Sequence, residues 1–187
     1  MLLTRPYFRE RAVQYARRWA LGRNPLFFDF SENGGDCTSF VSQCILAGCC
    51  TQNYTEDFGW YYISEDERAP AWSGVEFFYD FITGGGDFPP RMTRTGPTGM
   101  EVSASRAQIG DAVQLYDSED NFYHTLIISE KKDGEIYVCA HTNDYLDRPL
   151  SSYVNASGVR FIHIQAAIVE IEDDSCFEDL ISGKALP

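Results

Sequence analysis

The chain has 187 residues, of which 44% are hydrophobic and 14% aromatic, and its formal net charge is −13. This composition excludes a disordered chain and is sufficient for one domain, spanning residues 1–187, with a single buried core. Neither nucleic acid nor a membrane is an expected partner, because the negative charge repels phosphate backbones and anionic lipids and no stretch approaches the roughly 18 apolar residues that cross a bilayer.

Two helices are predicted in the first third of the chain. Over residues 6–21 the apolar side chains recur at spacings of three and four residues, which is typical of an amphipathic helix. The arginines of this region have no acidic run beside them, so we expect a solvated helix face, with a docking face as the alternative. A loop over residues 24–35 leads to a second helix that begins at Asp36 or Cys37 and ends at Gly48.

The rest of the chain changes from irregular to strand-forming. Residues 49–105 are the least regular part, with one predicted helix over residues 75–82. Beyond Gly110 short apolar runs predict strands, and Lys132-Asp133-Gly134-Glu135 is typical of a tight hairpin turn. Helices first and an antiparallel sheet afterwards predict an α+β fold. The strands are expected over residues 112–116, 125–129, 136–140 and 159–164.

Six cysteines occur without any C-x-x-C pair, so a structural metal site is not predicted. Their even number permits disulfides, although the neighbours Cys49 and Cys50 are poor partners for each other. Free thiols fit the composition equally well, because a chain this apolar does not need bridges. The six stand at positions 37, 44, 49, 50, 139 and 176.

Cys37 stands where a cysteine is best suited to act as a nucleophile. At a helix N-terminus the unpaired N–H groups and the helix dipole favour the thiolate. The preceding Gly34-Gly35 lets a carbonyl group approach closely, and the N–H groups of the first turn can hold an oxyanion. Asp36 suits an N-cap, but its charge beside Cys37 opposes thiolate formation.

The base must come from three histidines, His124, His141 and His163. A two-residue turn at Asp133-Gly134 places His124 opposite Asn143 on the neighbouring strand. Side chains alternate across a strand, so His141 and Asn143 share the face of His124. We therefore predict that His124 is the base.

A third polar group would fix the tautomer of the imidazole. The shared face offers His141, which we slightly favour, or Asn143. An error of one residue in the turn would bring in Thr142 or Asp144 instead. His163 lies in an alternating strand and is expected to be structural.

Four segments resemble one family in the same order along the chain. The run N-G-G-D-C-T-S-F-V-S-Q-C, residues 33–44, resembles the signature N-D-C-T-N-F-V-S-Q of the bacterial putative amidase domain family. Ser39, Cys49 and Thr125 depart from the family pattern, but Cys37 and His124 do not. The other three segments are the tryptophan pair of residues 59–62 and 71–73, the strand and histidine of residues 109–113 and 123–128, and the H-T-N-D element of residues 140–145.

The resemblance, which covers about residues 5–165, implies a papain-like NlpC/P60-type fold and bacterial origin. It further implies a cysteine amidase or peptidase that acts on cell-wall peptides, without metal or organic cofactor. Cys37 would be the nucleophile, His124 the base, and the H-T-N-D element the source of the third group. The rivals are a thiol acyltransferase and a non-catalytic wall-binding or interaction module.

Substrate-binding residues are expected among the aromatic side chains near the predicted site. Trp60, Tyr61 and Trp72 are candidates for groove walls, with core packing as the alternative, and Asp36 is grouped with them. The acidic tail, residues 170–187, lies outside the resemblance and has no predicted function. The chain is expected to be soluble, and its compartment and oligomeric state stay open.

Overall fold

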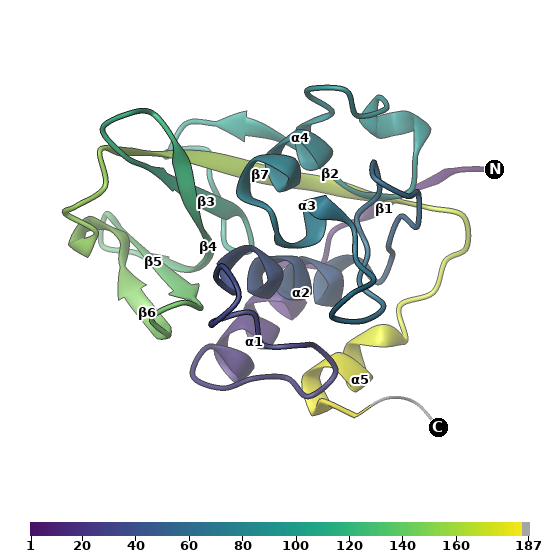
Figure 1. The fold of residues 1–187 in the computed structure, drawn as a ribbon, viewed down its shortest axis with the longest axis horizontal. Helices are drawn as coiled ribbons and strands as arrows, with labels where there is room; N and C mark the ends of the chain where they lie inside the picture. The colour runs from purple at the N-terminus through teal and green to yellow at the C-terminus, as the bar shows by residue number, and fades with distance from the viewer. Residues whose placement is uncertain (185–187) are drawn as a thin grey trace.

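The chain folds into helices packed against one antiparallel sheet, as a computed structural model that describes residues 1–184 shows (Figure 1). This arrangement confirms the predicted α+β class. In chain order the elements are β1 (Leu3–Pro6), α1 (Arg9–Trp19), α2 (Cys37–Cys49), α3 (Pro70–Ser73), α4 (Val75–Thr83), the 3-10 helix η1 (Arg91–Thr93), β2 (Gly96–Val102), β3 (Ala112–Tyr116), β4 (Phe122–Lys132), β5 (Glu135–Ala140), β6 (Tyr145–Pro149), the 3-10 helix η2 (Leu150–Ser152), β7 (Gly158–Val169) and α5 (Cys176–Ser182).

The sheet has the strand order β1-β7-β3-β4-β5-β6, and β2 pairs with β7 as well. The four strands predicted from the sequence are β3, β4, β5 and β7. Three strands were missed, β1, β2 and β6, and each contains a proline. Proline cannot donate to a sheet ladder and is tolerated at sheet edges, so it hides such strands from a pattern search. The first helix begins at Arg9, not at residue 6, because Pro6 belongs to β1.

The core lies on both faces of the sheet. Every residue of α2 is buried, and this helix packs with α1, α3 and α4 against one face. Alternate residues of β3, β4 and β5 point to the other face and form a smaller apolar cluster that includes Leu115, Leu126 and Val138. Successive side chains of one strand thus contribute in turn to the core beneath the helices and to the smaller cluster on the other face of the sheet.

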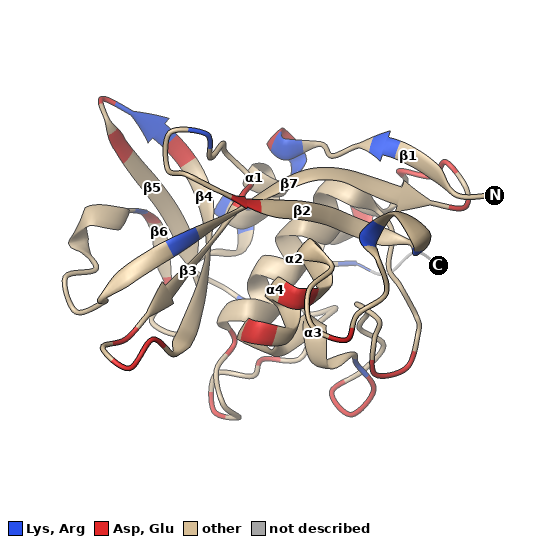
Figure 2. Ribbon diagram, turned by 90° about the horizontal axis from the view of Figure 1, so that it is seen from above, with Lys and Arg blue, Asp and Glu red and all other residues tan. Residues whose placement is uncertain are grey.

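Most arginines near the N-terminus form ion pairs, while Arg17 and Arg18 of α1 are exposed, as a solvated helix face predicts. Arg9 contacts Asp111 at 2.5 Å, and Arg11 contacts Asp174 at 2.9 Å. Arg23 lies near three aspartates. Acidic residues recur on several sides of the molecule (Figure 2). No helix within residues 1–184 is long and apolar enough to cross a membrane.

A disulfide joins Cys50, at the end of α2, to Cys176, the first residue of α5. The side chain of Trp19 also donates a hydrogen bond to the carbonyl of Leu180, 3.1 Å away. The acidic tail, for which the sequence predicted no role, therefore packs its helix α5 against α1 and α2. Its last residues, 185–187, lie outside the described part of the chain.

Replacing Cys50 and Cys176 together by Ser should lower the free energy of unfolding by about 2–5 kcal/mol, because the bridge closes a long loop in the unfolded chain. The bridged residues are 126 apart in sequence. Urea unfolding with and without reductant measures the effect. Reductant should destabilise the natural chain and leave the double variant unchanged; equal stability of the oxidised and reduced natural chain would contradict the bridge.

Candidate active site

Cys37 is the first residue of α2, and two glycines shape the approach to it. Gly34 and Gly35 have φ angles of +96° and +107°, a region that residues with a side chain rarely adopt. The Gly35 N–H donates to the carbonyl of Phe30, 3.1 Å away, which closes the turn. Only 8% of Cys37 is exposed, and it lines one opening in the surface.

That opening is a pocket of about 420 Å³, which Cys37 shares with His124 of β4. The two residues come from a helix end and a strand that are far apart in sequence, and the fold brings them to one cavity. Within residues 1–184 the one hydrogen-bond contact of Cys37 Sγ is with Thr38 Oγ1, 3.8 Å away. No hydrogen bond joins Cys37 to His124 in this part of the chain. The other lining residues are Gly34, Gly35, Leu115, Tyr123, Thr142, Asn143, Tyr145, Arg148, Ser152, Tyr153, Val154, Asn155 and Ala156.

The His124 imidazole is neutral at neutral pH. Burial and, second, the nearby positive charge of Arg148 lower the pKa of His124 to about 4. The ring lies beside two tyrosines, with centroid distances of 6.3 Å to Tyr123 and 6.4 Å to Tyr153. A neutral imidazole in a pocket with a thiol has the protonation state that a general base requires.

The predicted pairing of His124 with Asn143 is wrong. The hairpin begins as expected, with Lys132 opposite Glu135, but a bulge at Ser129 shifts the later pairs by one residue. Continued beyond the last pair, Ile127 with Cys139, this register puts His124 level with Thr142. An extra residue moves every following side chain to the other face of the sheet.

His141 consequently faces the helices rather than the pocket. It is buried, and its ring stacks on Phe40 of α2 with centroids 3.8 Å apart. Its Nε2 lies 2.9 Å from the carbonyl oxygen of Trp19, and its Nδ1 lies 2.6 Å from Asp36 Oδ2. Both ring nitrogens are therefore engaged, which corrects the expectation that His141 orients His124.

Asp36 forms the other half of this buried pair. Because a carbonyl only accepts, His141 Nε2 carries a hydrogen, and a second proton is shared between Nδ1 and Asp36 Oδ2. The pair is neutral overall whichever atom holds that proton, and Arg23 Nε lies 3.4 Å from the same oxygen. Asp36 is thus held by His141 and lies close to Arg23.

Asp36 is also too buried to bind substrate, since 1% of it is exposed. Its N–H donates to Thr142 Oγ1, 2.8 Å away, and so ties the start of α2 to the turn after β5. Asn143, the next residue in that turn, is exposed and lines the pocket. Of the two candidate orienting groups, only Asn143 therefore reaches the cavity of His124.

The aromatic groove predicted from the sequence is largely absent. Trp60 and Trp72 are 0% exposed and pack in the core, with ring centroids 5.0 Å apart. Tyr61 is half-buried and lies beside Tyr54, outside the pocket of Cys37. The alternative of core packing is correct for both tryptophans. The pocket's aromatic walls are tyrosines, Tyr123, Tyr145 and Tyr153, which the sequence analysis did not single out.

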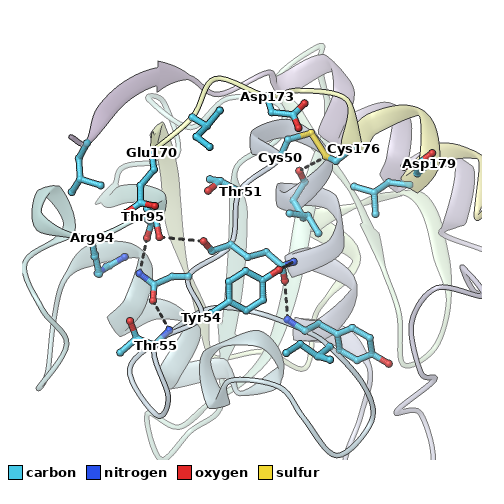
Figure 3. Close-up of a pocket in the computed structure, with 18 of the residues that line it drawn as sticks. Cys50, Thr51, Tyr54, Thr55, Arg94, Thr95, Glu170, Asp173, Cys176 and Asp179 are labelled. Carbon is cyan, nitrogen blue, oxygen red and sulfur yellow. Dashed lines mark hydrogen bonds between the residues drawn. A yellow bond between two sulfur atoms is a disulfide. The ribbon is translucent and has the colours of Figure 1, made fainter. Parts of the chain in front are cut away.

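A larger pocket of about 1110 Å³ lies at the other end of α2 (Figure 3). Its wall includes Cys50 and Cys176, but these are bonded to each other and offer no free thiol. Neither Cys37 nor His124 lines it. The larger volume therefore does not mark the pocket that contains Cys37 and His124. The smaller pocket is the candidate active site. Within residues 1–184 no group of three His, Cys, Asp or Glu side chains is arranged to hold a metal ion.

Comparisons with known proteins identify one family and one curated relative. Residues 6–164 match the model of the putative amidase domain. The uncharacterized protein YhbB of Bacillus subtilis (strain 168) is 28% identical over 143 residues, which are 74% of this chain and 42% of the relative. The chain thus spans less than half the length of that protein. No solved structure matches.

Removing either half of the Asp36 and His141 pair should lower the free energy of unfolding by about 3–5 kcal/mol, because the other half is left buried and unpaired. Urea unfolding of Asp36→Ala, His141→Ala and the double variant measures this. We expect the double variant to lose less than the sum of the single variants by about 1–3 kcal/mol. Strictly additive losses would show that the two residues do not depend on each other.

Proposed function

The chain belongs to the putative amidase domain family, and from this premise we propose that it hydrolyses amide bonds with Cys37 as nucleophile and His124 as general base. Family membership points to hydrolysis of an amide. The cysteine mechanism is our proposal, and one observation carries it: a thiol at a helix N-terminus and a neutral imidazole line the same pocket.

The proposed reaction has two steps. The Cys37 sulfur attacks the amide carbonyl while His124 takes the thiol proton, and the resulting imidazolium gives this proton to the leaving amine as the C–N bond breaks. A water molecule then attacks the thioester, with His124 again taking a proton, and the acid is released as the C–S bond breaks and the thiol is reprotonated. His124 accepts and returns one proton in each step, first from the thiol and then from the water.

The start of α2 supports the developing negative charge on the carbonyl oxygen. The first-turn N–H groups of a helix have no partner within the helix, and the dipole favours an anion there. The Asp36 N–H is already donated to Thr142, so the Cys37 N–H is the first one free to act as an oxyanion donor. The glycines at 34 and 35 leave room for the substrate carbonyl beside it.

We infer a papain-like NlpC/P60-type architecture from the helix that carries the cysteine and the antiparallel strand that carries the histidine. Asn143 is the proposed third group; Thr142, the alternative for a register shifted by one residue, also lines the pocket, but its hydroxyl already accepts the Asp36 N–H. The proposed substrates are peptides or peptidoglycan-derived peptides. The Cys50 to Cys176 disulfide favours an oxidising compartment outside the cytosol, where such substrates occur.

Cys37→Ala and His124→Ala should each lower turnover by about a thousandfold or more while the fold survives, because each removes a group that the chemistry requires. Mass analysis of fragments from purified peptidoglycan and from defined peptides measures turnover and separates hydrolysis from transfer to an amine. Cys139→Ala is the matched control, since this free thiol lies outside the pocket. Full activity in Cys37→Ala would end the proposal.

The low pKa of His124 predicts activity that persists in mild acid. A base with a pKa of about 4 stays neutral at pH 5–6, where an ordinary histidine is largely protonated. The acid limb of kcat/KM should therefore lie well below pH 6.

Because the pKa of His124 is lowered in the folded state, the stability contributed by neutral His124 is present above about pH 6.5 and is lost as the pH falls through about 4. A midpoint near pH 6.5 in the acid limb of kcat/KM would contradict the assignment of His124 as the base.

A further inference from the structure

We propose that Arg148 is a specificity residue that binds a carboxylate of the substrate close to the amide bond attacked by Cys37. This inference rests on the proposed function and adds the substrate class: amides with an acidic group on the residue beside the scissile bond. It assigns a role to β6, a strand that was not predicted from the sequence.

The charges around the pocket are opposite to those of the whole chain. The protein has 28 Asp and Glu residues and 15 Lys and Arg residues. None of the residues that line the pocket is acidic, and Arg148 is the one Lys or Arg among them. An anionic group would therefore meet attraction inside the pocket, although the molecule as a whole repels anions.

The sheet register places Arg148 on the same face as His124. Arg148 of β6 pairs directly with Val138 of β5, which pairs with Ile128 of β4. His124 lies four residues before Ile128 on β4, and side chains four apart on a strand share a face. The ring of Tyr153 contacts both groups, with its centroid 6.4 Å from that of His124 and 4.1 Å from Arg148 Cζ.

The guanidinium is held in place without being neutralised. Its Nε donates to Ser152 Oγ at 2.7 Å and its Nη2 to the Ser152 carbonyl at 3.2 Å. Tyr145 and Tyr153 each lie 4.1 Å from Cζ. In the described part of the chain no carboxylate pairs with Arg148, unlike Arg9, Arg11, Arg17, Arg23 and Arg160.

One nitrogen of Arg148 remains available. Over residues 1–184 its Nη1 has no hydrogen-bond partner, and it is not among the buried atoms. A fixed guanidinium with a free N–H edge is well suited to a carboxylate, because charge-assisted hydrogen bonds to a planar fork are strong and directional. The carboxylate can be a free C-terminus or an acidic side chain.

The first test uses two alkylating probes of the same size, the anion iodoacetate and the neutral iodoacetamide. Both form a carbon–sulfur bond at Cys37 and release iodide. Arg148→Met keeps the apolar contacts with the tyrosines and removes the charge. We expect it to lower the iodoacetate rate about tenfold relative to the iodoacetamide rate, and Arg148→Lys to restore part of the difference.

Arg17→Met is the control, because Arg17 lies on α1 and is already paired with Asp147. An unchanged ratio of the two rates in a folded Arg148→Met variant would overturn the inference. This readout needs the Cys37 thiol but no amide turnover. Failure of hydrolysis and failure of carboxylate binding can therefore be told apart.

The second test identifies the source of the carboxylate through matched peptides. One pair differs in a free or amidated C-terminus, and the other in Glu or Gln beside the scissile bond. We expect the natural chain to prefer the acidic member of one pair by at least tenfold in kcat/KM, and Arg148→Met to abolish that preference. Equal kcat/KM for both members of both pairs would overturn the inference.

Discussion

The buried contact between Asp36 and His141 fixes the position of the start of α2, on which the candidate site depends. It joins the start of α2 to the turn after β5, and the hydrogen bond from the Asp36 N–H to Thr142 reinforces it. A carboxylate next to a nucleophilic cysteine would be unfavourable if it were uncompensated. Pairing with an imidazole turns this carboxylate into a neutral anchor, and the helix end can then present Cys37 to the pocket.

The bulge at Ser129 separates the roles of the two histidines. In a regular hairpin His124 and His141 would lie on the same face of the sheet. The extra residue sends His141 into the helical core and leaves His124 on the face that also carries Leu115 and Arg148. One strand irregularity therefore separates the buried imidazole of His141 from that of His124, the proposed base.

The sequence allowed the helix that begins at Cys37 and the strand Ala112–Tyr116 to be predicted, because glycines before a helix and a short apolar run after a glycine are local signals. It did not reveal the bulge, since Ser129 is flanked by neither Gly nor Pro. Arg148 was missed because β6 ends in proline and carries a weak strand pattern, and Tyr153 was missed because it follows the short helix η2, which was not predicted either. The tryptophans were misjudged because an aromatic side chain fits a core as well as a groove.

The complete burial of α2 has a consequence for how related chains can diverge. A substitution anywhere along this helix changes the packing of the core that supports Cys37. Residues 152–156, which form the rim of the pocket, are less constrained by packing, because each of them is at least partly exposed. Substitutions should therefore accumulate at the rim, so that homologues differ in the substrates they bind sooner than in the proposed chemistry at Cys37.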